Sequence, residues 1–288
     1  MKKHLLTIVI ILMFIVGLSV LLYPAISNYI NSKHASRVIS QYNDELDKMD
    51  EENKQRVLKE AEDYNRRLRE TPSAFYKPSL VEGYESTLDI TGNGAMGYID
   101  IDRINVELPI YHTVEESVLQ VGAGHLEGTS LPVGGRSTHC VLSGHRGLPS
   151  ARLFTDLDEL EIGDEFTITV LDRKLTYLID QIKIVEPKET EDLMIEEGKD
   201  YCTLMTCTPY GINTHRLLVR GVRIENADEK PGVFVKNEAF RIEPLIVTPI
   251  VALPMLVAAF VFVLVKDKKR KKRQNAEKKE EQVSEDEK

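Results

Sequence analysis

The sequence predicts a mainly β protein in which a closed barrel follows N-terminal helices and lies between two transmembrane helices. From residue 96 onward, short segments alternate apolar and polar residues at close spacing, as the half-buried strands of a barrel do. Residues 32–70 are rich in charge and contain no Gly or Pro, which favours helices. Two uncharged apolar runs near the ends of the chain are about as long as bilayer-spanning helices.

The first apolar run, Leu5–Tyr23, has nineteen residues without a charge and follows Lys2 and Lys3. Its length is close to the roughly 20 residues that cross a bilayer. A cleaved signal peptide is the alternative, but the run is long for one and residues 24–27 are a poor cleavage site. We therefore expect an uncleaved anchor.

The second apolar run, Pro244–Val265, ends in a basic cluster at residues 266–273. The positive-inside rule places both basic flanks in the cytoplasm. We therefore expect a two-pass membrane protein whose central part is extracellular and whose termini are both cytoplasmic. The expected order begins with an N-terminal anchor (1–23), an extracellular helical region with a possible lid or linker (24–95) and a barrel domain (96–230). A juxtamembrane linker (231–243), a transmembrane helix (244–265) and a charged cytoplasmic tail (266–288) follow.

Charge is unevenly distributed along the chain, whose net charge is −9. Basic residues gather beside the two apolar runs, so the segment between the runs is strongly acidic. An acidic surface argues against binding nucleic acid. Three cysteines are too few for a small domain held together by disulfides.

The charged segment at residues 32–70 carries apolar residues at three- and four-residue steps, which predicts two amphipathic helices packed on another surface. These residues are Val38, Tyr42, Leu46 and Met49, then Val57, Ala61, Tyr64 and Leu68. We expect a break between the helices near residues 50–53. A free-standing stalk is the alternative, because each apolar stripe is narrow.

Period-2 alternation predicts strands at residues 98–101, 104–108, 165–170, 175–179 and 182–185. Asp172-Arg173 has the composition of a hairpin turn between two of them. Residues 151–160 are expected to form a short helix that ends before Gly163.

Three chemically reactive or charged residues stand at expected strand ends. Cys207 closes the buried stretch 203–207 just before a turn that contains Pro and Gly, His145 follows an apolar run, and Arg216 begins another. A small buried hydrophobe is the alternative for a lone free cysteine. Because a thiol needs a base and acyl transfer needs a donor for the oxyanion, the three residues together indicate thiol acyl transfer.

Four stretches of the chain resemble the sortases, the cysteine transpeptidases of Gram-positive cell surfaces. Thr203–Cys207 matches the TLxTC signature of that family. The segments GHLEGTSLPVGG, SGHRGLPSARLFTDLD and TCTPYGINTHRLLVRG, at 124–135, 143–158 and 206–221, are similar to the pilus-assembling class C enzymes. The resemblance implies an eight-stranded barrel.

The resemblance also assigns roles: Cys207 as nucleophile, His145 as acid/base and Arg216 as oxyanion stabiliser. It implies that the enzyme cleaves an LPxTG-like sorting signal between Thr and Gly and joins the acyl group to a lysine of another pilin. The expected partners are therefore the membrane and pilin subunits that carry such signals and acceptor lysines. A sortase that attaches proteins to peptidoglycan is an alternative, and the second membrane helix counts against it.

Two further alternatives are weaker. An L,D-transpeptidase would carry its cysteine after Ser-His-Gly or Ser-Thr-Gly, a context that is absent here. A non-catalytic pilus scaffold would have no need of Cys207, His145 and Arg216 together.

Class C sortases often carry a lid with an Asp-Pro-aromatic motif before the barrel, and no such tripeptide occurs here. Phe75 and Tyr76 are the nearest aromatic residues, either in a linker or in a lid of another kind. Without an aspartate beside these aromatic residues, no obvious acidic side chain pairs with Arg216 to hold a lid closed over the site. We therefore expect Cys207 to react readily with small thiol reagents.

No cofactor and no metal site are expected. His125 and His139 lack HExxH or paired-cysteine spacing, so they are interpreted as structural histidines. His215 is adjacent to Arg216 on a strand and should face away from the site.

Cys140 precedes His145 by five residues, and Cys202 precedes Cys207 by five. If the two strands are parallel neighbours, Cys140 and Cys202 face each other, away from the catalytic face. A disulfide between them is less favoured, because parallel neighbours hold Cβ atoms further apart than the roughly 3.8 Å that a disulfide prefers.

Overall fold

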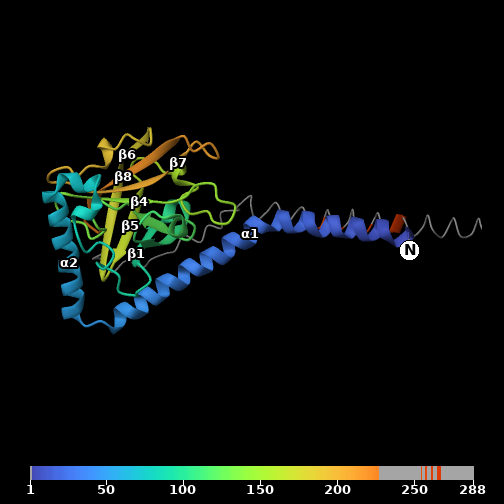
Figure 1. Cartoon of the computed structure of the whole chain (residues 1–288), viewed down its shortest axis with the longest axis horizontal. Coiled ribbons are helices and arrows are strands. Elements are labelled where there is room, and N and C mark those ends of the chain that lie inside the picture. Colours follow the sequence, from blue (N-terminus) through green and yellow to red (C-terminus); the bar gives the residue numbers. More distant parts are fainter. Residues whose placement is uncertain (1, 227–253, 255–256, 258–260, 262–264, 267–288) are drawn as a thin grey trace, which may run out of the picture. The chain divides into compact units, whose positions relative to one another are not determined.

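Eight strands close into one barrel, in the order β1-β2-β3-β4-β7-β8-β6-β5 (Figure 1). Neighbouring strands are antiparallel except for the two parallel pairs β2–β3 and β4–β7. The strands are β1 Ala95–Ile101, β2 Val106–Tyr111, β3 Ala123–His125, β4 Thr138–Ser143, β5 Glu165–Val170, β6 Arg173–Val185, β7 Asp200–Thr208 and β8 His215–Ile224. The predicted closed eight-stranded barrel is confirmed.

The computed structural model describes residues 2–226 together with residues 254, 257, 261, 265 and 266. The chain divides into two units, one formed by residues 1–25 and 235–288 and the other by residues 26–234. The barrel belongs to the second unit. Apart from the four described residues within it, the predicted helix at 244–265 lies outside the described residues, as do the linker at 231–243 and most of the charged tail.

Two long helices precede the barrel, α1 Lys2–Lys48 and α2 Glu51–Glu70. The predicted break lies between them at Asp50, whose carboxylate caps α2 by accepting a hydrogen bond from the backbone N–H of Asn53 at 2.8 Å. Glu51 and Glu52 follow in the first turn, where acidic side chains stabilise the positive end of a helix.

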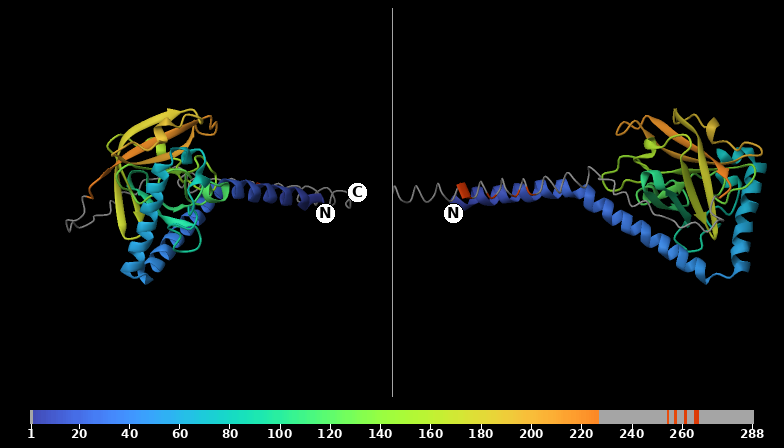
Figure 2. Two further views of the ribbon diagram at one scale, coloured as in Figure 1. Left: turned by 60° about the vertical axis from the view of Figure 1, so that its left-hand side comes forward. Right: turned by 180° about the vertical axis from the view of Figure 1, so that it is seen from behind.

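Both helices pack on the barrel, and the views in Figure 2 show α2 running beside the strands. Their buried residues are Ala35, Val38, Ile39, Tyr42, Leu46, Ala61, Tyr64, Asn65 and Leu68. The Tyr42 hydroxyl donates to the Met96 carbonyl and accepts from the Leu171 N–H, each at 2.9 Å. The helices are therefore part of the core, and a free-standing stalk is excluded for this region.

α1 also contains a candidate membrane span. From Ile11 onward the helix includes a window with a mean hydropathy of 2.0, and its length is sufficient to cross a bilayer. Apolar side chains along this part of α1, such as Leu12, Met13 and Val20, are exposed. This agrees with membrane anchoring through the N-terminal helix.

Cys140 and Cys202 face each other across the β4–β7 pair, as predicted. Both lie in the barrel interior, and the three cysteines of the chain are free thiols. Burial raises the pKa of the Cys202 thiol well above its ordinary value, so this residue is unsuited to act as a nucleophile.

Candidate active site

Cys207 and Arg216 lie directly opposite each other on the antiparallel strands β7 and β8. Directly opposed residues hold their Cβ atoms about 4.5–5.5 Å apart on one face of the sheet. Both side chains are partly buried. The next pair, Thr208 and His215, faces the other way because side chains alternate along a strand, which confirms the prediction for His215.

The surface that Cys207 shares with neighbouring strands is called here the outer sheet face. Its members alternate with residues that fill the barrel core, such as Cys202 and Leu204. It is formed by His139 and Val141 of β4, Thr203, Met205 and Cys207 of β7, Arg216, Leu218 and Arg220 of β8, and Gln181, Lys183 and Val185 of β6.

His145 follows β4 by two residues and comes level with Cys207. The N–H of Gly144 donates to the Met205 carbonyl at 3.0 Å, and the Thr206 hydroxyl donates to the Gly144 carbonyl at 2.7 Å. These bonds extend the parallel alignment past the end of β4. The structure therefore brings the three predicted residues together at one end of the outer sheet face.

The loop after His145 is held by close packing and by α1. A Cβ on Gly144 would lie 2.6 Å from the ring of Phe154, so only glycine fits beside this buried side chain. Phe154 donates its N–H to the His145 carbonyl at 3.1 Å. From α1, Asn28 accepts from the N–H of Arg152 at 3.0 Å and Asn31 donates to the Ser150 carbonyl at 2.9 Å.

The helix predicted at residues 151–160 is wrong. Residues 157–159 form a single 3-10 turn, and the rest is irregular. Leu153 has a left-handed φ of 43°, which ends any right-handed helix at that point. Because Phe154 enters the core and α1 satisfies nearby backbone groups, tertiary contacts outweigh local helix propensity here.

Arg216 keeps most of its hydrogen-bonding capacity for a ligand. Its Nη1 donates to the carbonyls of His215 at 3.1 Å and Asn213 at 3.4 Å. Within the described part of the chain no carboxylate forms an ion pair with Arg216. A guanidinium has five N–H donors, so it can also bind an oxyanion beside Cys207.

Sequence reasoning missed one residue of this site. The carboxylate of Glu116, in the short helix α3 Glu116–Leu119, lies 3.1 Å from His145 Nε2. Glu116 is 29 positions from His145 in the chain and sits in an ordinary polar turn. No spacing or composition signal in the sequence distinguishes it from its neighbour Glu115.

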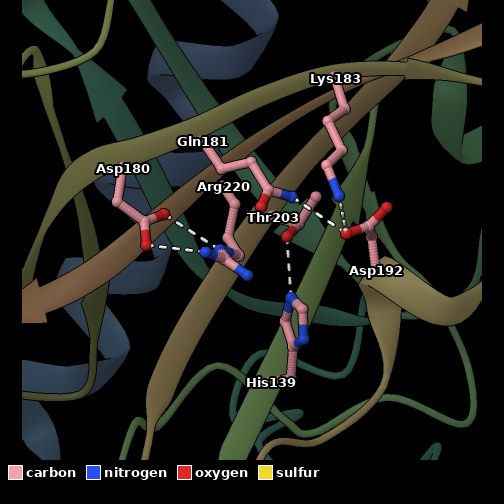
Figure 3. Close-up of polar contacts among 7 residues, drawn as sticks. All are labelled: His139, Asp180, Gln181, Lys183, Asp192, Thr203 and Arg220. Carbon is pink, nitrogen blue, oxygen red and sulfur yellow. Dashed lines mark hydrogen bonds and ion pairs between the residues drawn. The ribbon is translucent and has the colours of Figure 1, made fainter.

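The opposite end of the outer sheet face holds a polar network (Figure 3). Arg220 makes a bidentate ion pair with Asp180, with hydrogen bonds of 3.0 and 2.8 Å. The guanidinium carbon of Arg220 lies 4.2 Å from the ring centre of Tyr201. Asp192 accepts from Lys183 at 2.6 Å and from Gln181 at 3.1 Å. Asp192 belongs to η5 Glu191–Leu193, so this contact ties the β6–β7 loop to β6.

His139 provides a second tether for the same loop. Its Nδ1 lies 2.9 Å from the Met194 carbonyl, and its Nε2 lies 2.8 Å from the Thr203 hydroxyl. Because a carbonyl only accepts, Nδ1 carries the proton and the hydroxyl donates to Nε2. Burial lowers the pKa of His139 to about 4, so the ring is neutral at physiological pH. His125 is likewise buried and bonded, so the structural interpretation of both histidines is confirmed.

A pocket of about 640 Å³ lies beside this tethered loop. Its walls come from the end of α2, the segment η1 Pro72–Phe75, the turn after β3 and the β6–β7 loop. The residues that line it are Leu68, Arg69, Thr71, Pro72, Phe75, Gly128, Thr129, Ser137, Leu193, Met194, Ile195 and Glu197.

No group of three or more metal-ligating side chains occurs among the residues the structure describes.

Phe75 lines the pocket and also covers part of the outer sheet face. It packs on the apolar cluster of Val141, Leu193 and Leu218, as does Met205, which is two residues before Cys207. Tyr76 is 68% exposed, and its hydroxyl bonds to Thr190 of the β6–β7 loop at 3.1 Å. The segment at residues 71–94 is therefore packed against the barrel and is not a loose linker.

The fold and this site together define a class of protein: a closed β-barrel that presents a thiol, an imidazole and a guanidinium at adjacent strand ends, as acyl transfer through cysteine requires. Comparison with known proteins agrees. The Sortase domain family model matches residues 99–224. Sortase D of Bacillus subtilis (strain 168) is 30% identical over 169 residues, covering 54% of this chain and 82% of that protein.

Solved structures give the same result. Sortase C1 of Streptococcus agalactiae is 49% identical, with a TM-score of 0.61 over 66% of this chain and 99% of its own. A sortase C of Streptococcus pneumoniae, described for its catalysis and pilin substrate specificity, is 45% identical, with a TM-score of 0.61 over 66% of this chain and 97% of its own. The chain belongs to the sortase family of cysteine transpeptidases, within class C.

The buried histidine predicts a pH dependence of stability. His139 has a pKa of about 4 in the folded state against 6.5 ordinarily, so between these values the unfolded chain binds a proton that the folded chain does not. Stability is therefore full above pH 6.5 and falls toward pH 4, by up to about 3 kcal/mol from this residue. Urea unfolding of the full-length protein in detergent at several pH values measures the slope.

His139→Gln should flatten this slope between pH 6.5 and 4, even though the variant is less stable overall. His34→Gln, which changes an exposed histidine of α1, is the matched control and should keep the wild-type slope. Equal slopes for wild type and His139→Gln would contradict the assignment.

Proposed function

We propose that this sortase cleaves an LPxTG-like sorting signal between Thr and Gly and joins the acyl group to a lysine of a second pilin, so that pilins polymerise. The observation that carries the proposal is the alignment of Cys207 with Arg216 across β7 and β8, with His145 at the end of the neighbouring strand β4. Similarity to sortase C structures, one of which is described for pilin substrate specificity, supports the substrate class.

In the first half-reaction the Cys207 thiolate attacks the Thr carbonyl carbon. Arg216 donates hydrogen bonds to the oxyanion of the tetrahedral intermediate. As the C–N bond breaks, the His145 imidazolium gives its proton to the departing Gly amine, and a thioester remains on Cys207.

In the second half-reaction a lysine amine of another pilin attacks the thioester carbonyl. Neutral His145 now takes the proton from the attacking nitrogen, and Arg216 again stabilises the oxyanion. Collapse of this intermediate forms the isopeptide bond, releases the Cys207 thiolate and leaves His145 protonated for the next cycle.

We further propose a two-pass arrangement, with both termini in the cytoplasm and the barrel outside the cell. The candidate span in α1 supports the first crossing. The apolar run at 244–265 and the basic cluster that follows it in the sequence support the second. This topology would hold the barrel at the membrane surface, where secreted pilins emerge.

The first test uses full-length protein in detergent, a sorting-signal peptide and two competing acceptors, a lysine-bearing pilin and a peptidoglycan-type amine. Mass spectrometry should detect a thioester on Cys207 and then an isopeptide product. Cys207→Ala should abolish both products, whereas Cys140→Ala, the matched control at a buried thiol, should retain most of the transfer. Full activity in the Cys207 variant would refute the catalytic role, and transfer only to a peptidoglycan amine would redirect the function to wall attachment.

Arg216→Ala tests the oxyanion role. Loss of one preorganised donor lowers turnover by about 10²–10³, so kcat should fall by that factor while KM for the peptide changes little. Arg223→Ala changes another arginine of β8, near the opposite end of the strand from Arg216, and should behave as wild type. A rise in KM with intact kcat would assign Arg216 to substrate binding.

Phe75 tests whether the segment before the barrel restricts the substrate. We propose that Phe75 must leave the outer sheet face before a peptide can lie along it, while Cys207 itself stays accessible to small molecules. Phe75→Ala should therefore lower KM for the peptide by roughly 3–10-fold, because the competent state becomes more populated. The rate at which a small haloacetamide labels Cys207 should stay within about twofold of wild type.

Leu80→Ala, at an exposed position of the same segment, is the control and should change neither quantity. A many-fold rise in haloacetamide labelling on loss of Phe75 would show instead that Phe75 plugs the thiol itself. An unchanged KM would remove any gating role from this residue.

A further inference from the structure

Glu116, which is not one of the three proposed catalytic residues, makes a direct side-chain contact to His145. Its Oε2 lies 3.1 Å from His145 Nε2. Its other oxygen accepts from Gln120 Nε2 at 3.1 Å, one turn further along. Gln120 and then His145 hold the pKa of the Glu116 carboxyl below its ordinary value, so it is present as a carboxylate.

The position of Glu116 is set by the fold, because α3 is anchored on both sides. Leu119 lies against Gly124 of β3, where a Cβ would come within 3.1 Å of its methyl group, and Val118 packs on the barrel core. Because Gln120 donates to Oε1 of Glu116, Oε2 is the oxygen that contacts His145. The contact thus joins the β2–β3 connection to the end of β4.

A carboxylate can only accept hydrogen bonds, so the contact requires the proton of His145 to be on Nε2. The other ring nitrogen, Nδ1, is then the one left for the reaction. The contact therefore decides which ring nitrogen of His145 can exchange a proton with the leaving and attacking amines.

Other charged or titratable groups around His145 do not duplicate this effect. Arg146 beside it is neutralised by an ion pair with Asp158 and lies against the ring of Tyr210. Cys207 and Arg216 lie level with the end of β4, on β7 and β8. On α3 itself, Glu115 makes no side-chain contact to His145 among the described residues.

We propose that Glu116 is a positioning residue of the transfer reaction, which fixes the tautomer and the ring orientation of His145. This rests on the proposed role of His145 as acid and base. Among the described residues the side chain of Glu116 bonds to Gln120 and His145 and not to Cys207, so it acts through the imidazole. The pair is partly solvated, with 24% of the His145 side chain and 68% of the Glu116 side chain exposed, so its effect is modest.

The test compares Glu116→Ala, which removes the acceptor, with Glu115→Ala, the same change one residue away. The first readout is the ¹⁵N chemical shifts of the ring nitrogens of selectively labelled histidine in the full-length protein at alkaline pH, with His145 assigned by its absence in His145→Gln. These shifts distinguish a proton on Nδ1 from a proton on Nε2. Wild type and Glu115→Ala should carry the proton of His145 on Nε2, and Glu116→Ala should show a mixture of the two tautomers.

The second readout is kcat for peptide cleavage, measured together with KM and the melting temperature. Because Glu116 contacts the imidazole, Glu116→Ala should lower kcat by about 3–10-fold while KM and the melting temperature stay near their wild-type values. Glu116→Gln, whose amide oxygen can also accept from Nε2, should partly restore kcat. A purely structural role would lower the melting temperature and leave the tautomer unchanged.

The same tautomer of His145 in wild type, Glu116→Ala and Glu115→Ala would overturn the proposal. The NMR measurement needs no substrate, so it decides the role of Glu116 even if the peptide is never cleaved. Failure of wild-type cleavage would instead count against the proposed function.

Discussion

The parallel pairing of β4 with β7 is the constraint on which the site depends. Thr138 to Ser143 pair one-for-one with Asp200 to Met205, and this register decides which residues meet beyond the strand ends. Inside the barrel, Leu142 and Leu204 are fully buried, each worth about 1.5–3 kcal/mol of burial. A shift of one residue would turn one strand's apolar set outward, so the core that stabilises the barrel also aligns His145 with Cys207.

The sequence carries much of this arrangement, because strand alternation and turn residues are local signals. The equal five-residue offsets of Cys140 and Cys202 predict their pairing correctly, since both strands stay regular between the two cysteines and the site. Residues 151–160 show where local signals fail. Their composition favours a helix, but Phe154 must fill the core beneath Gly144, and that requirement depends on a strand that the local segment does not contain.

Glu116 could not be found from the sequence for a related reason. Two adjacent glutamates have the same chemistry, and the path of the chain from β2 through α3 to β3 decides which one reaches His145. The tether of the β6–β7 loop is similar, because His139 of β4 meets Met194 across 55 positions of the chain. Such contacts are properties of the closed barrel and carry no signature in any single stretch.

The outer sheet face therefore has two ends with different chemistry. At one end Arg216 is unpaired with any carboxylate in the described residues, and the thiol beside it is partly exposed. At the other, Arg220 and Lys183 are neutralised by Asp180 and Asp192. Between them Phe75 covers the face through apolar contact. An ion pair to Arg216 would weaken with salt, whereas apolar cover does not, so the proposed gating by Phe75 leaves Arg216 free for its proposed role as oxyanion donor.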